Sequence, residues 1–195
     1  MRIRNLQLLS LGLMAPIFLG GCSMNINKDK TADGKKRVDI ETPMGSLHVS
    51  DQADVKDTGL SVYPGATPKP KDDSDEEKSG NVNISGPGFA LKVVAAEFES
   101  DAAPDKILTY YKNELKKYGN VLECHGHWQG GGNANIHSGK DESKPVSCES
   151  NDNGKSVELK VGTEGNQHVV AVEPKEGKTN FALVYVKIHG KDAEI

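Results

Sequence analysis

Aromatic residues make up only 5% of this sequence and hydrophobic residues 35%, which is little for a chain that packs fully into a core. Part of the chain is therefore expected to be tail and loop. An excess of basic residues is also missing, because 24 lysines and arginines stand against 28 acidic residues and give a formal net charge of −4. Without a concentrated basic face, the sequence gives no reason to expect a nucleic-acid partner.

The common catalytic and cofactor-binding motifs are absent as well. The sequence has no G-x-S-x-G, S-x-x-K or H-E-x-x-H motif, no phosphate-binding loop and no dinucleotide fingerprint. Gly86-Pro87-Gly88 indicates a turn, because a phosphate cradle needs a helix N-terminus directly after the glycines. We therefore expect no enzymatic activity and no cofactor.

Long hydrophobic runs are scarce too, and the longest extends from Leu6 to Leu19. It is shorter than the roughly 20 apolar residues that a permanent membrane-spanning helix needs. Arg2 and Arg4 precede it, and small residues follow it. This order of a charged, an apolar and a small-residue region is typical of a signal peptide.

The run ends in Leu19-Gly20-Gly21-Cys22, which resembles the lipobox of bacterial lipoproteins. In that family the cysteine thiol receives diacylglycerol, the chain is cut before the cysteine, and the new amine is acylated, for example with palmitate. The resemblance implies that residues 1–21 are a signal peptide and that Cys22 carries a stable lipid anchor. It also implies a place in the cell envelope, where Ser23 favours the outer membrane, facing the periplasm. An ordinary secretory signal peptide is the alternative.

After the anchor, we expect a flexible basic tether over residues 22–36 and a single domain over residues 37–195. The lysines of the tether either contact anionic headgroups or are simply solvated. Loops are predicted at 63–80 and 129–145. The acidic residues of the first loop lack the order of a calcium-binding EF-hand loop, so a solvated loop is the favoured interpretation.

Two segments of the expected domain echo each other. Residues 38–49 and 82–93 share the pattern V-x-I-x-x-P-x-x-x-L-x-V. Each has two alternating arms around a Pro/Gly break, which predicts a β-hairpin, and the first would be an N-terminal hairpin. The echo reflects either a duplicated hairpin that binds a ligand or the residue pattern that unrelated hairpins share.

One helix is predicted, beginning near Pro104 after a cap at Ser100 or Asp101 and closing at Gly119. Its apolar stripe consists of Ile107, Leu108, Tyr111, Leu115 and Tyr118. Alternation of apolar and polar residues predicts strands at 89–98, 121–128, 145–150, 155–163, 168–173 and 180–189. The strand at 180–189 has apolar residues on both of its faces, so it should be central in the sheet. One helix packed on a mostly antiparallel sheet is an α+β fold, here a two-layer sandwich.

Tyr63-Pro64-Gly65-Ala66, followed by a strand and by "YYKNELKKYG", resembles uncharacterised exported bacterial domains. That resemblance implies no mechanism.

The stretch "ECHGHWQGGG" concentrates reactive residue types. On a strand, alternation places Cys124 with Leu122 and Trp128 on one face, expected to be the core face, and the histidines on the other. Cys148 should lie inward on the adjacent strand. Because export favours oxidation, we predict a disulfide between Cys124 and Cys148.

A metal site is the alternative use of this stretch. His125 and His127 could share one zinc or copper ion, with His137 or Glu123 as a third ligand. Trp128 is a candidate platform for a small ligand, although a tryptophan at this position can equally belong to the core or its rim.

Together these features predict a lipid-anchored cell-envelope lipoprotein with a non-enzymatic interaction or structural domain. Its partners would be the membrane, through the anchor, and an envelope protein or glycan.

Overall fold

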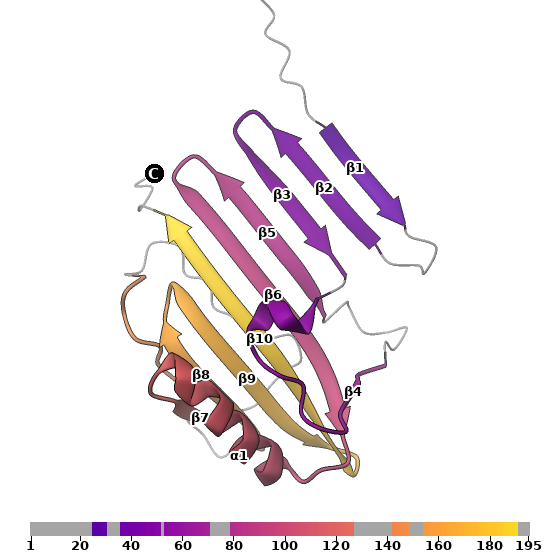
Figure 1. Ribbon diagram of the computed structural model, residues 1–195, viewed down its shortest axis with the longest axis vertical. Coiled ribbons are helices and arrows are strands. Elements are labelled where there is room, and N and C mark those ends of the chain that lie inside the picture. The colour runs from indigo at the N-terminus through magenta and orange to yellow at the C-terminus, as the bar shows by residue number, and fades with distance from the viewer. Residues whose placement is uncertain are drawn as a thin grey trace, which may run out of the picture.

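Antiparallel strands make up most of the structure (Figure 1). The computed structural model describes residues 25–30, 36–51, 53–70, 79–126, 142–148 and 154–190. In chain order the elements are β1 (Asn25–Lys30), β2 (Lys36–Thr42), β3 (Gly45–Ser50), the 3-10 helix η1 (Val55–Thr58), β4 (Thr67–Pro68), β5 (Gly80–Gly86), β6 (Phe89–Ser100), α1 (Pro104–Leu115), η2 (Lys116–Tyr118), β7 (Leu122–Gly126), β8 (Ser156–Thr163), β9 (Asn166–Lys175) and β10 (Lys178–Gly190).

All ten strands belong to one sheet. Its order is β1-β2-β3-β5-β6-β10-β9-β8-β7, and the short β4 pairs with β6 beside this path. Every pairing is antiparallel. The prediction of a mostly antiparallel sheet with one α-helix is thereby confirmed for the described residues. The apolar strand expected at 180–189 is β10, and it lies centrally between β6 and β9.

The two echoing segments both fold back on themselves. β2 pairs with β3 across Thr42 and Gly45, and β5 pairs with β6 across Gly86 and Phe89. The two pairs are neighbours because β3 also pairs with β5. Gly45 is required at this contact, since a Cβ there would approach the carbonyl oxygen of Ser85 too closely.

The helix α1 packs on one face of the C-terminal half of the sheet. Its buried residues Ile107, Leu108, Tyr111 and Leu115 belong to the apolar stripe that the sequence predicts. They form one core with side chains from β8, β9 and β10, among them Leu159, Val161, Val170, Val172, Phe181 and Leu183. Within the described ranges no helix is long and apolar enough to cross a membrane.

The ends of α1 differ from the prediction. Ala103 is the N-cap residue, and no side chain caps the helix. Because Pro104 holds the preceding residue in an extended conformation, Ser100 lies too far upstream, and its Oγ accepts a hydrogen bond from Ala102 N instead. The helix ends at Leu115 and continues as η2, so Gly119 follows the 3-10 turn.

Two further segments differ from the prediction. The region expected to be a strand at 145–150 makes one bridge in the described residues, between Pro145 and Thr163. Two backbone hydrogen bonds flank this bridge, one from Glu164 N to the carbonyl oxygen of Lys144 and one from Val146 N to that of Gly162. Conversely, Asn25–Lys30 lies within the expected tether and forms β1, which pairs along its whole length with β2.

Candidate functional site

Polar side chains form two rows across the N-terminal half of the sheet, on the face that carries α1. In one row, the register aligns Asp39, His48, Asn83, Lys92 and Lys187 across five strands. In the next row, it aligns Glu41, Ser46, Ser85, Ala90 and His189. Because side chains two residues apart share a face, both rows point to the same side as the core residue Leu183.

A groove of about 250 Å³ lies over these two rows. Its polar lining consists of Ser46, His48, Asn83, Ser85, Lys92, Lys187 and His189. Ala90 lies between Ser85 and His189 in the second row and contributes only a methyl group, so the surface is hollow beside the longer side chain of His189. Among the described residues that line the groove, none is acidic.

Contacts inside and beside the groove orient its polar groups. His48 Nδ1 lies 2.8 Å from Asp39 Oδ1, and the hydroxyls of Ser46 and Ser85 are 2.8 Å apart. Lys92 Nζ lies 3.8 Å from Asp57 Oδ1, which projects from η1. The carboxylates therefore stand outside the groove, each next to one of its cationic or imidazole groups.

This arrangement suits binding better than nucleophilic catalysis. The described contact of His48 is with a carboxylate, and that of Ser46 is with another hydroxyl. A serine nucleophile needs a general base, such as histidine or lysine, within hydrogen-bond reach of its own Oγ. Two lysines, two imidazoles and two hydroxyls instead provide donors for an anionic group.

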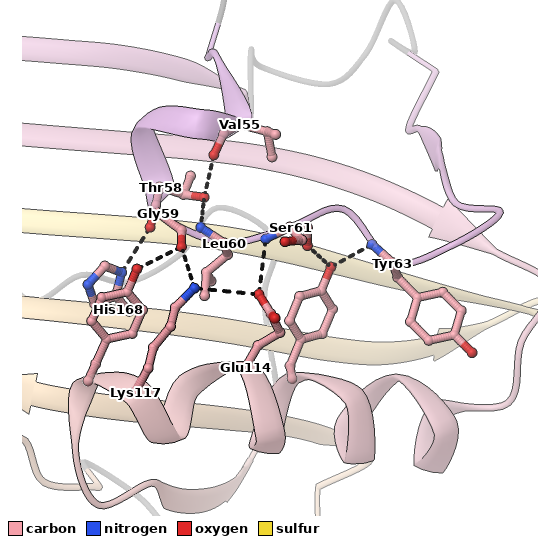
Figure 2. A network of polar contacts seen from close by, with 11 residues as sticks. Val55, Thr58, Gly59, Leu60, Ser61, Tyr63, Glu114, Lys117 and His168 are labelled. Carbon is pink, nitrogen blue, oxygen red and sulfur yellow. Dashed lines mark hydrogen bonds and ion pairs between the residues drawn. The ribbon is translucent and has the colours of Figure 1, made fainter.

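A second polar network fixes η1 at the side of the groove (Figure 2). His168 Nδ1 lies 2.9 Å from the carbonyl oxygen of Thr58. The carbonyl oxygen of Gly59 accepts hydrogen bonds from Tyr118 Oη at 2.7 Å and from Lys117 Nζ at 3.1 Å. Strand β9 and the end of the helix thus hold the segment that carries Asp57.

The same segment is held at Tyr111, whose side chain is fully buried. Its hydroxyl donates to the carbonyl oxygen of Ser61 at 3.1 Å and accepts from Tyr63 N at 3.0 Å (Figure 2). Burial raises the pKa of Tyr111 above the ordinary tyrosine value, so its proton stays in place for this contact. These contacts are structural, and they position η1.

The predicted disulfide is present in the structure. Cys124 and Cys148 are bonded, with their Cα atoms 5.5 Å apart. Cys124 points inward and His125 outward, as predicted, but the buried face of Cys124 is not the one that carries α1: the register places Cys124 opposite Glu158, on the other face. The helix packs instead on the side of Val121 and Val157, yet Cys124 is only 3% exposed. Cys22 lies outside the described residues.

His125 is exposed and points to the α1 side of β7, opposite to Cys124. Its Nε2 lies 3.3 Å from Glu123 Oε1, and the carboxylate of Glu123 also pairs with Lys112 of α1. The hydrogen bond from Lys112 is the main reason why the pKa of Glu123 is lowered, with His125 adding to the effect. Glu123 is therefore ionised beside the imidazole.

The remaining predicted ligands, His127, His137 and Trp128, lie outside the described residues. Within the described part of the chain, no group of three or more histidine, cysteine, aspartate or glutamate side chains is placed to hold a metal ion. The zinc or copper site stays a prediction.

The groove was not predicted from the sequence, although the two echoing segments, 38–49 and 82–93, contain most of its polar residues. The shared proline lies in the turn of each hairpin, and the other four shared residues are apolar and fall on the other face of the sheet. The residues between them differ, and these include Asp39, His48, Asn83 and Lys92, which form one row.

No family model matches the chain, and comparison with curated proteins and with solved structures likewise finds no match.

Proposed function

We propose that this chain is a lipid-anchored cell-envelope protein whose domain binds an anionic ligand without transforming it. The lipobox-like ending at Cys22 supports the anchor. The domain is a two-layer α+β module with an N-terminal hairpin, in which α1 covers the C-terminal half of the sheet and the groove occupies the same face of the other half.

One observation carries the binding proposal. Lys92 and Lys187 lie opposite each other on β6 and β10, and His48 and His189 line the same groove, whose described lining includes no acidic residue. Lysine ammonium groups bind carboxylate or phosphate oxygens through charge-assisted hydrogen bonds. The hydroxyls of Ser46 and Ser85 and the amide of Asn83 supply the neutral donors that orient such a group.

Calorimetric titration of the purified protein with inorganic pyrophosphate tests the groove. We expect binding that weakens as salt rises, since the contact is electrostatic. A Lys92→Gln/Lys187→Gln double variant should lose roughly tenfold or more in affinity, because two charge-assisted hydrogen bonds are removed. Circular dichroism confirms that the variant is folded.

Lys106→Gln is the matched control, since it removes one exposed positive charge from the start of α1, outside the groove. It should leave the affinity unchanged. Absence of binding by the unmodified protein, or an equal loss in the control, would contradict the groove as the ligand site.

A further inference from the structure

The face of the sheet opposite to α1 carries two registered rows of apolar side chains. One row crosses six strands and consists of Ile26, Ile40, Leu47, Ile84, Leu91 and Ile188. The next row begins with Lys28 at the sheet edge and continues with Val38, Val49, Val82, Val93 and Val186. We call these rows the apolar ladder. The described segments that pack over the sheet at α1 and η1 lie on the other face (Figure 1). The inner end of the apolar ladder is nevertheless packed: Val186 is fully buried, and the partly buried Leu91, Val93 and Ile188 pack against the buried cluster to which it belongs. The part of the ladder outside this cluster, which is half-buried or exposed, lies on β1, β2, β3 and β5.

The exposed part of the apolar ladder gathers at one corner of the sheet. Three large hydrophobic side chains are exposed in the described residues: Ile26 at 50%, Met44 at 74% and Tyr118 at 37%. Ile26 lies at the start of β1, and Met44 lies in the turn between β2 and β3. The two are close to the same end, because Asn25 is opposite Glu41 in the register (Figure 1). Ile26 and Met44 are thus the two large apolar side chains that are open to solvent at this end of the described sheet.

The first described residue, Asn25, lies at this same corner. Asn25, the first residue of β1, follows Cys22 by three positions, and three extended residues reach roughly 10–11 Å. If Cys22 is lipidated, the corner with Ile26 and Met44 is held at the membrane surface. This step rests on the anchor that the proposed function contains.

We propose that the part of the apolar ladder on β1, β2, β3 and β5 rests on the lipid bilayer, with Ile26 and Met44 inserted at the interface. Lys28 extends the valine row at the sheet edge and faces the headgroups, where anionic lipids attract it. In this orientation α1 and the groove face the aqueous side. A lipid surface fits better than a second copy of the chain, because the exposed apolar residues gather at the anchored corner rather than at the centre of the face.

Fluorescence quenching of the lipidated full-length protein in phosphatidylethanolamine/phosphatidylglycerol vesicles tests this orientation. Single variants Ile26→Cys and Ile40→Cys carry an environment-sensitive fluorophore on the apolar ladder, while the native disulfide leaves no other protein thiol to react. Asn27→Cys and Glu41→Cys are matched controls, since each is the next residue on the same strand and points to the opposite face.

We expect nitroxide-labelled lipids to quench the two ladder positions roughly twofold or more strongly than the controls, and aqueous iodide to quench them less. Equal lipid quenching at all four positions would overturn the proposal. So would ladder labels that are shielded from both quenchers, because that pattern identifies a protein surface, such as a second copy, as the occupant.

The mass of the N-terminal peptide from the same preparation separates the two proposals. A missing acyl modification on Cys22 would contradict the anchor, and with it the inferred orientation. An acylated protein without lipid quenching at Ile26 and Ile40 would contradict the orientation alone.

Discussion

His168 is an imidazole enclosed by two aromatic rings. Its ring centroid lies 3.8 Å from that of Tyr118 and 4.8 Å from that of Tyr185, with nearly parallel planes. Its Nδ1–H donates to the carbonyl oxygen of Thr58. Burial lowers the pKa of His168, and the nearby charge of Lys117 lowers it further. The folded protein therefore holds this ring in its neutral form.

This lowered pKa predicts a loss of stability in mild acid. The unfolded chain takes up a proton at the ordinary histidine pKa of about 6.5, whereas the folded protein does so only at lower pH. Between these two values the unfolded state binds more protons. The contribution of this group to the free energy of unfolding should thus be complete above about pH 7 and fall below pH 6.5, by at most about 1.4 kcal/mol per pH unit.

Urea unfolding between pH 5 and pH 8 measures this dependence. His168→Asn is the informative variant, because its amide can donate to the carbonyl of Thr58 but does not titrate. We expect the variant to have a flatter profile than the unmodified protein. Identical slopes in the two proteins would show that other groups cause the acid sensitivity.

At the scale of single residues, the sequence could not predict this contact. His168 and Thr58 are separated by 110 positions, and the strand pattern around 168–173 only indicates a sheet residue. Cys124 illustrates the same limit. Alternation correctly separates it from His125, but which face receives the helix is decided by residues far away in the chain.

At the scale of elements, local patterns were sufficient where apolar periodicity is strong. The stripe of α1 and the alternating strands β6, β8, β9 and β10 are where the sequence predicts them. β1 was missed because "NINKDK" has little apolar periodicity of its own and becomes a strand by pairing with β2. A strand at 145–150 was predicted from the apolar Val146, but the described part of this region pairs with β8 only through the bridge at Pro145 and the two hydrogen bonds beside it.

The disulfide stabilises an edge of the sheet that has few other contacts. β7 is the last strand in the order, and Cys124 joins it to the segment around Cys148, 24 positions away. Closing a loop of this length stabilises the folded state by roughly 3 kcal/mol, through the entropy of the unfolded chain. We expect the Cys124→Ala/Cys148→Ala variant to lose stability of this order in urea unfolding.

Reduction provides the control for this prediction. Dithiothreitol should lower the unfolding midpoint of the unmodified protein to near that of the double variant, and it should leave the double variant unchanged. If the midpoints of the oxidised protein and the variant coincide, the bond adds no stability to β7.

At the scale of the whole molecule, the N-terminal half of the sheet has one apolar and one polar face, and the two echoing segments contribute to both. Their shared letters place Val38, Ile40, Leu47 and Val49 beside their counterparts in the apolar ladder. Their variable letters line the opposite, polar face, where the groove lies. A sheet built in this way can turn one face to lipid and the other to a ligand, and the point of attachment decides which way it turns.

The proposed attachment through Cys22 would therefore decide the orientation of the whole molecule. Replacing residues 1–22 with a secretory signal peptide that has its own cleavage site exports the same domain without the lipid acceptor. We expect this variant to lose fatty-acid labelling and to fractionate with soluble proteins. The apolar ladder alone should provide only weak, reversible attachment, since stable anchoring takes more than one acyl chain or equivalent signal.

The Cys22→Ser variant in the native leader is the complementary measurement, because it changes one atom and keeps the rest of the sequence. It should also lose fatty-acid labelling, while its uncleaved leader keeps it in the membrane fraction. Labelling that persists in Cys22→Ser would place the lipid on another residue. Unchanged membrane fractionation of the leader-exchanged protein would instead show that the domain holds itself to the membrane, and the lipid would then be unnecessary for the orientation of the sheet.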